Sequence, residues 1–270
     1  MSALRLQAEE ADGGVAGALL EECEARLDVV DAAQIAKLVV VGDRPPSDQI
    51  DDYPFTTWLW LTLLPGQMAP TRTIAAELRS VDADPERMRW VIPTHVHIDH
   101  VGGIVDLPDA PILLAAEEIA FARSRADARE LHVVPAHARA LEGRTTPIPF
   151  EDEPYEIFPR SFDVFGDGAI VIVPMPGHTP GSVGVFVNHG EHRVLHAGDV
   201  VHDDAGYLDR VAKPPIMRPT DHDPAAADRS VALLHALHET VPDLQILPAH
   251  SRPAWQELFE SEEPRCIDWR

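Results

Sequence analysis

Three histidines and one aspartate lie within six residues of the segment THVHIDHVGG, which spans residues 94–103. In an extended backbone, side chains two residues apart point to the same side, so His95 and His97 can reach one ion. Asp99 and His100 are displaced from that pair, and one ion cannot easily use all four groups. Neutral imidazole nitrogens and carboxylate oxygens suit zinc first, then iron or manganese. The segment therefore predicts a metal site, most simply for two ions.

Three later segments repeat one pattern, in which an apolar run of the kind that forms a strand leads to a histidine or an aspartate. The runs are IVIV before His178, VLHA before Asp199 and LQIL before His250. Ligands in sheets flanked by helices gather at the carboxyl ends of strands, so we expect one pocket. Its seven ligands would be His95, His97, Asp99, His100, His178, Asp199 and His250. This set suffices for two divalent ions, with one carboxylate left to bridge them.

The order of these motifs resembles the metallo-β-lactamase-fold hydrolases. The resemblance rests on HVHIDH at 95–100, GHTPG at 177–181, Gly198-Asp199 and the late His250, and it covers residues 88–251. It implies an α/β fold with four layers, αββα, in which two mixed sheets lie between outer helices and the metals sit at one sheet edge. Strand and helix alternation alone would also allow a doubly wound sheet.

The resemblance also implies how the ligands divide. The first metal would be held by His95, His97 and His178. The second metal would be held by Asp99, His100 and His250, and Asp199 would bridge the two. A hydroxide between the ions would be the nucleophile, and Asp99 would be catalytic as well, because it can handle a proton from the collapsing intermediate.

The implied reaction is hydrolysis of a small ester-like substrate, with a lactone as the first choice. Three other hydrolytic reactions stay open: thioester cleavage of the glyoxalase II type, phosphotriester hydrolysis and β-lactam hydrolysis. A second class of function is an iron-dependent oxidoreductase of the sulfur dioxygenase type. A third class is a protein that binds metal without turnover.

His202 is the second catalytic candidate. Family members that hydrolyse acyl-homoserine lactones have a tyrosine shortly after the bridging aspartate, whereas this chain has His202 there and its nearest tyrosine is Tyr207. An imidazole at this place could donate a hydrogen bond to a substrate oxygen. A solvated loop histidine is the equal alternative, and Tyr207 and His222, in the same segment 202–222, are the next substrate-contact candidates.

Charge and length bound the remaining possibilities. The chain has 270 residues, 22 basic against 45 acidic, and a net charge of -23, so we expect a small-molecule substrate and no nucleic-acid partner. Its two cysteines, Cys23 and Cys266, predict neither a disulfide framework nor a thiolate ligand. The first residues lack an apolar signal core, and no segment approaches the roughly 18 apolar residues of a membrane span, so we expect a cytoplasmic protein without a membrane partner.

The default organisation is a single domain over residues 1–270, with residues 1–50 as a candidate N-terminal extension, and a homodimer is left open. Two helices can also be placed. Asp223-Pro224 predicts a helix start, with an apolar stripe of Val231, Leu234, Leu237 and Val241 behind it. A strand over 112–114 should lead into a helix over 115–131.

Overall fold

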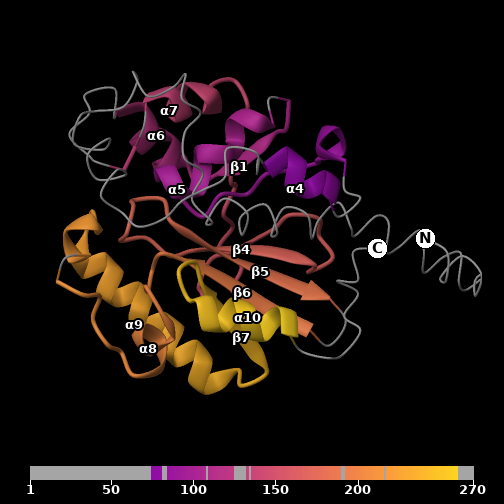
Figure 1. Cartoon of the computed structure of the whole chain (residues 1–270). Helices are drawn as coiled ribbons and strands as arrows, with labels where there is room; N and C mark the ends of the chain where they lie inside the picture. Colours follow the sequence, from indigo (N-terminus) through magenta and orange to yellow (C-terminus); the bar gives the residue numbers. More distant parts are fainter. Residues whose placement is uncertain are drawn as a thin grey trace, which may run out of the picture.

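The computed structural model describes residues 74–80, 84–107, 109–124, 132–133, 135–189, 192–215 and 217–260. Figure 1 shows helices α4 to α7 and strand β1 in one half of the molecule, and strands β4 to β7 with α8 to α10 in the other. Within these ranges no helix has both the length and the apolar character needed to cross a membrane. The predictions for residues 1–50, Cys23 and Cys266 fall outside them, so the single domain over 1–270 stays a prediction.

Strands β1 (Ile112–Leu114) and β2 (Thr145–Pro147) form a small parallel sheet. This sheet packs against the helices of the first half of the described chain. The predicted strand over 112–114 is confirmed. The apolar segment before His95, in contrast, is not a full strand, because it contributes only a single bridge from Val91 to Ile112. Pro93 follows two residues later and has no backbone N–H to donate, which ends the pairing before the first ligand.

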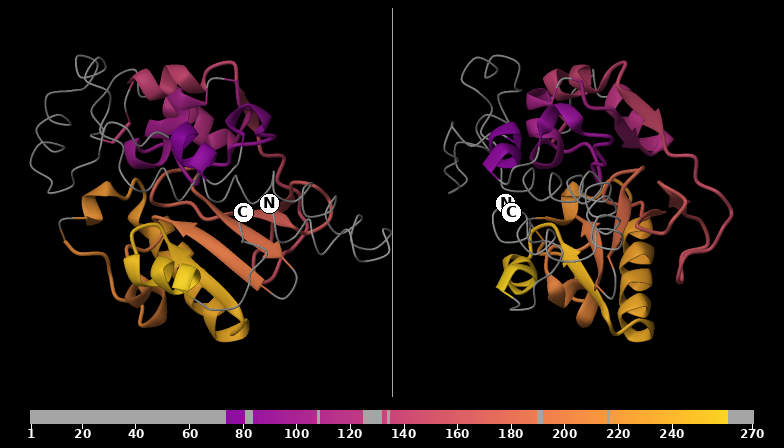
Figure 2. Two further views of the ribbon diagram at one scale, coloured as in Figure 1. Left: turned by 45° about the vertical axis from the view of Figure 1, so that its right-hand side comes forward. Right: turned by 90° about the vertical axis from the view of Figure 1, so that its right-hand side faces the viewer.

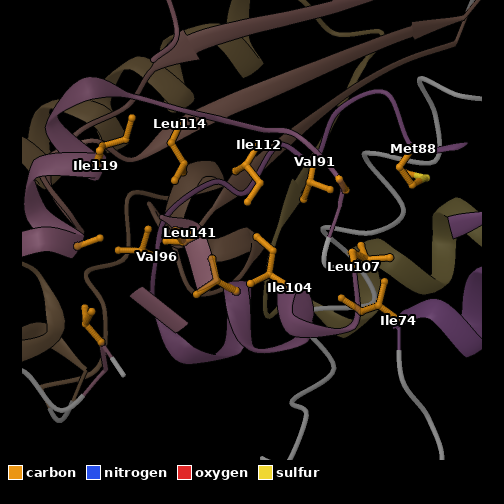
Figure 3. Packing of buried hydrophobic residues seen from close by; sticks show 14 of the residues in the cluster. Ile74, Met88, Val91, Val96, Ile104, Leu107, Ile112, Leu114, Ile119 and Leu141 are labelled. Atoms are coloured by element: carbon orange, nitrogen blue, oxygen red, sulfur yellow. The ribbon is translucent and has the colours of Figure 1, made fainter. Parts of the chain in front are cut away.

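The outer face of the small sheet is covered by α4 (Ile74–Ser80), α6 (Ala116–Ser124) and α7 (Pro135–Leu141). Ile112 and Leu114 of β1 point into this helical layer, where Figure 3 shows them among Ile104 and Leu141. Leu113 points the opposite way, toward the second sheet. The predicted helix after β1 is therefore confirmed through Ser124, and residues 125–131 lie outside the described ranges.

The second sheet has five strands in sequence order. They are β3 (Phe162–Asp163), β4 (Ile170–Pro174), β5 (Val183–His189), β6 (His192–Gly198) and β7 (Leu244–Pro248). The first three pairings are antiparallel, and β7 joins β6 in parallel. Strands β4, β6 and β7 therefore run in one direction, and their carboxyl ends reach the same edge of the sheet.

Alternate residues of β4 face different layers. Ile172 packs with Leu113 of the small sheet, whereas Val173 packs with Leu234 of helix α9 (Pro224–Thr240). The layers thus follow the order helices, small sheet, large sheet, helices. The predicted αββα arrangement is confirmed, and the doubly wound alternative is wrong, because a single sheet would not place two strand layers in contact.

At β6 and β7, helices from the C-terminal part lie on both faces of the larger sheet. Helix α9 is capped by Asp223, whose carboxylate accepts from two backbone N–H groups of the first turn, so the predicted helix start is confirmed. Helix α10 (Arg252–Glu260) packs on Val194 and Leu247, on the face opposite α9, and the right view of Figure 2 shows the strands between these two helices. A short helix, α8 (Asp204–Leu208), lies beside α9.

Candidate metal centre

Four chain segments meet at the edge where β4, β6 and β7 end. The loops after these strands carry His178, Asp199 and His250, respectively. The segment with the first ligands joins them through a hydrogen bond of 3.0 Å from the Val183 N–H at the start of β5 to the Thr94 carbonyl. It then turns at His97 into the one-turn helix α5 (Ile98–Val101). The structure therefore brings together all seven ligands expected from the sequence.

His95, His97 and His178 form the first group. Each offers a ring nitrogen within 4.8 Å of the others, and each side chain is almost completely buried. The Nδ1 atom of His97 lies 2.9 Å from Nε2 of His178. The Nε2 atom of His95 is buried and has no hydrogen-bond partner among the described residues. Three imidazoles thus point at one small volume with their nitrogens inward.

Asp99, His100, Asp199 and His250 form the second group, again with ligand atoms within 4.8 Å of one another. The Oδ2 atom of Asp199 lies 3.2 Å from Nε2 of His250 and 3.4 Å from Nε2 of His178, which belongs to the first group. Its other oxygen lies 3.3 Å from Nε2 of His100. Of the two carboxylates in this group, Asp199 is therefore the one that also contacts the first group.

This donor set fits divalent cations. A buried polar atom without a partner costs about 1–3 kcal/mol, yet in the described part of the chain His95 Nε2, His100 Nε2 and Asp199 Oδ1 all lack a hydrogen bond. The atoms around them are ring nitrogens and carboxylate oxygens with lone pairs of their own, so a cation between the groups would give each of these atoms a partner. Imidazole and carboxylate in groups of three and four match the ligand number of zinc and related metals.

Burial and neighbouring charges shift the pKa values of the side chains differently in the two groups. Burial lowers the pKa of His95 and of His97 well below its ordinary value, so these imidazoles are neutral and can bind a metal. Burial acts in the same direction on His250, but attraction to Asp199 outweighs it and raises the pKa of His250 to about 9. Burial would raise the pKa of Asp199, but His100 and His250 together hold it well below the ordinary value.

Two glycines allow the ligand loops to approach their neighbours. Gly198, with φ +54°, precedes Asp199, and a Cβ atom there would lie 2.9 Å from the Thr94 side chain. Gly177, with φ +139°, precedes His178, and a Cβ atom there would lie 2.1 Å from the backbone nitrogen of Ala227. At Gly177 a larger residue would have to move the backbone of α9, and at Gly198 it would have to displace the Thr94 side chain, so each loop depends on its glycine.

Several polar residues around the ligands were missed by the sequence analysis. Thr94 Oγ1 lies 3.1 Å from Nδ1 of His95 and 3.4 Å from Nδ1 of His100, which leaves both Nε2 atoms toward the centre. Asp221 Oδ1 lies 3.0 Å from Nδ1 of His178 and also accepts from the ammonium of Lys213. Asp221 stands in a polar loop where spacing gives no signal, because its partner is 43 residues away.

The remaining candidates occupy different settings. The ring of His202 stacks on His250 with centroids 5.4 Å apart, so this residue lies beside the second group. Tyr207 does not line the site, because it is only 8% exposed and packs in the core with Val200 and Leu237. His222 is exposed, and its backbone N–H donates to the His178 carbonyl. Of the three, His202 is the one whose ring contacts a ligand.

The sequence matches the family described as the metallo-beta-lactamase superfamily over residues 65–250. A probable metallo-hydrolase of Mycobacterium tuberculosis is 30% identical over 200 residues, which cover 68% of this chain and 61% of that protein. An N-acyl homoserine lactonase of Bacillus thuringiensis is 25% identical over 131 residues, 47% of this chain and 45% of the lactonase. The chain thus spans less than two thirds of the length of either relative.

Solved structures show the same fold. An N-acyl homoserine lactone hydrolase with the product N-hexanoyl-L-homoserine bound at its catalytic metal centre superposes with a TM-score of 0.55 at 20% identity. The matched region covers 71% of this chain and 67% of that one. A mutant of AiiA from B. thuringiensis, with N-decanoyl-L-homoserine bound at the active site, gives the same TM-score and identity. At this identity the likeness concerns the fold alone.

Asp221→Ala should weaken metal binding about 10-fold to 100-fold, because His178 loses the carboxylate that fixes its ring orientation. Asp221→Asn keeps an oxygen acceptor and should lose less. Competition with a chromophoric chelator measures both affinities, and Asp228→Ala, on an exposed helix face, is the matched control. Wild-type affinity in Asp221→Ala would show that the contact with His178 has no part in metal binding.

Proposed function

The chain belongs to the metallo-beta-lactamase superfamily of metal-dependent hydrolases, and from this premise we propose that it binds two zinc ions and hydrolyses a lactone. The observation that carries the proposal is the division of seven ligands into two groups, with Asp199 in contact with both. One ion in either group would leave the other group's buried nitrogens and oxygens without partners, which is costly.

The proposed roles of the residues follow from that division. His95, His97 and His178 would hold one ion. Asp99, His100 and His250 would hold the other, with Asp199 between them. Two divalent ions, when bound, lower the pKa of a shared water and polarise the carbonyl oxygen of a substrate. The protein then needs no nucleophilic side chain, and its own residues have to orient the ester and supply a proton to the leaving oxygen.

Asp99 is the residue best placed for that proton. Its side chain is 30% exposed, against 12% for Asp199, so it is the more accessible carboxylate of the second group. Its Oδ2 atom lies 3.5 Å from Nε2 of His250 and 3.7 Å from Nε2 of His100. A carboxylate in this position can take a proton and pass it to the alkoxide that leaves when an ester bond breaks.

Support for a lactone as the ester comes from the relatives. The N-acyl homoserine lactonase of B. thuringiensis aligns with 47% of this chain. When a lactone opens, the bond between the acyl carbon and the ring oxygen breaks, and the alkoxide stays in the same molecule through the other ring carbons. One proton from a nearby donor then neutralises it. His202 stacks on His250 and could in addition donate a hydrogen bond to the substrate carbonyl.

A substrate panel tests this function. The zinc-loaded protein should open N-acyl homoserine lactones or simple γ-lactones with a higher kcat/KM than it shows for thioesters, phosphotriesters or β-lactams. The assay monitors ring opening through the proton that is released when the hydroxy acid forms. Failure to open any lactone would overturn the proposal. Oxygen consumption by the iron-loaded protein with a thiol-linked substrate would favour the oxidoreductase instead.

Asp99→Asn should lose at least about 100-fold in lactone turnover, because an amide is a poor metal ligand and cannot carry the proton. Circular dichroism should be unchanged, since the side chain is partly exposed and isosteric. Asp228→Asn, exposed on α9, is the matched control and should keep full activity. A near wild-type rate in Asp99→Asn would remove this residue from the mechanism.

His202→Ala should reduce kcat on the order of 10-fold to 1000-fold while metal content stays at the wild-type level, as expected for the loss of one oriented donor. His202→Phe separates donation from packing, because phenylalanine can stack on His250 but has no N–H. If His202 is a donor, both variants are slow. Unaltered kinetics in His202→Phe would reduce its role to a ring contact.

A further inference from the structure

Glu118 is a buried carboxylate outside the ligand set. It lies in the first turn of α6, and its side chain is 0% exposed. Its neighbours one turn on, Phe121 and Ala122, are also buried, so the acidic group stands on the inner face of the helix. A carboxylate in this setting needs several hydrogen bonds to offset the loss of its hydration.

The two oxygens of Glu118 accept three hydrogen bonds. Oε1 accepts from the Val96 N–H at 2.8 Å. Oε2 accepts from the Gly181 N–H at 2.9 Å and from the Thr179 hydroxyl at 2.7 Å. Both oxygens are therefore used, and each reaches a different loop.

The three donors to Glu118 lie close to ligands of the first group in the sequence. Val96 stands between His95 and His97, and Thr179 directly follows His178. The two loops that supply the first metal group are thus joined through one side chain. The donors do not lie in the loops that carry Asp199 and His250, and Val96 precedes α5, which carries Asp99 and His100. The backbone that Glu118 contacts is therefore the part beside the ligands of the first group.

The close fit of the second loop supports this reading. A Cβ atom at Gly181 would lie 2.4 Å from the backbone nitrogen of Glu118, so the loop lies directly against α6. The Thr179 N–H also donates to the Ser182 hydroxyl at 3.0 Å, which closes the turn after His178. Small changes in this contact would shift His178 relative to His95 and His97.

We propose that Glu118 is a positioning residue that sets the spacing of His95, His97 and His178 before metal binds, and so selectively raises affinity at the first group. The inference rests on the proposed two-metal site. A carboxylate is required because it offers an acceptor to both loops. Glutamine would turn an N–H₂ toward one of the donors, and aspartate is one methylene too short to reach both.

The test compares Glu118→Gln with Glu117→Gln, an exposed neighbour on the same helix. Chelator competition with zinc gives a dissociation constant for each of the two ions. In Glu118→Gln one constant should be about 10-fold to 100-fold higher than in wild type, and the other should stay within about 2-fold. Glu117→Gln should match wild type at both. Thr179→Val removes one of the three donors and should give a smaller loss, which keeps the test available if Glu118→Gln folds poorly.

Two further readouts assign the effect to the first group. In a His178→Ala background, where that group has lost a ligand, Glu118→Gln should leave the affinity of the remaining ion unchanged. In metal-free protein, hydrogen exchange at the Val96 and Gly181 amides should be faster in Glu118→Gln than in Glu117→Gln.

Equal weakening of both ions, or wild-type affinities, would overturn the positioning role. These results are separate from the fate of the proposed function. A chain that opens no lactone can still show the selective loss at one ion, and an active lactonase can show none.

Discussion

The close packing of imidazole and carboxylate groups at one sheet edge is the constraint on which the rest of the structure depends. Nitrogens and oxygens from four segments point at each other, and several are buried without a hydrogen bond in the described chain. Such a cluster is unfavourable by itself, because each group has lost its hydration. It is stable where cations lie between the groups, so the surrounding fold has to hold the ligands together.

The fold meets this constraint through strand direction and close backbone contacts. Because β4, β6 and β7 run the same way, three ligand loops leave the sheet at one edge. Glycines before His178 and Asp199 let two of these loops approach their neighbours closely. Thr94, Glu118 and Asp221 then fix the rings or the backbone on either side of them. The site is thus held by polar contacts as well as by the apolar core.

Local sequence was sufficient for the features that short motifs encode. The seven clustered residues could be predicted as candidate ligands because each follows a strand or stands in a dense motif. The α9 cap could be predicted because Asp and Pro occupy adjacent places. The αββα layers were inferred from the family resemblance, since strand patterns do not show which sheet packs on which. Pro93 explains why the segment before His95 is a single bridge rather than a full strand.

Contacts between distant segments were not predictable in the same way. Glu118 bonds to residues 22 and 63 positions away, although an acid on the buried face of a predicted helix was a usable signal. Asp221 gave none. Tyr207 was ranked by its distance in sequence from Asp199, but the turn into α8 carries it into the core. Proximity along the chain indicates a substrate contact only when the path of the loop is known.

Anomalous diffraction from crystals of the zinc-loaded protein tests the central claim most directly, because it locates each ion among named side chains. We predict two peaks of similar occupancy, one among His95, His97 and His178 and the other among Asp99, His100 and His250, with Asp199 in contact with both. A single peak at saturating zinc, or peaks outside this cluster, would contradict the two-metal account.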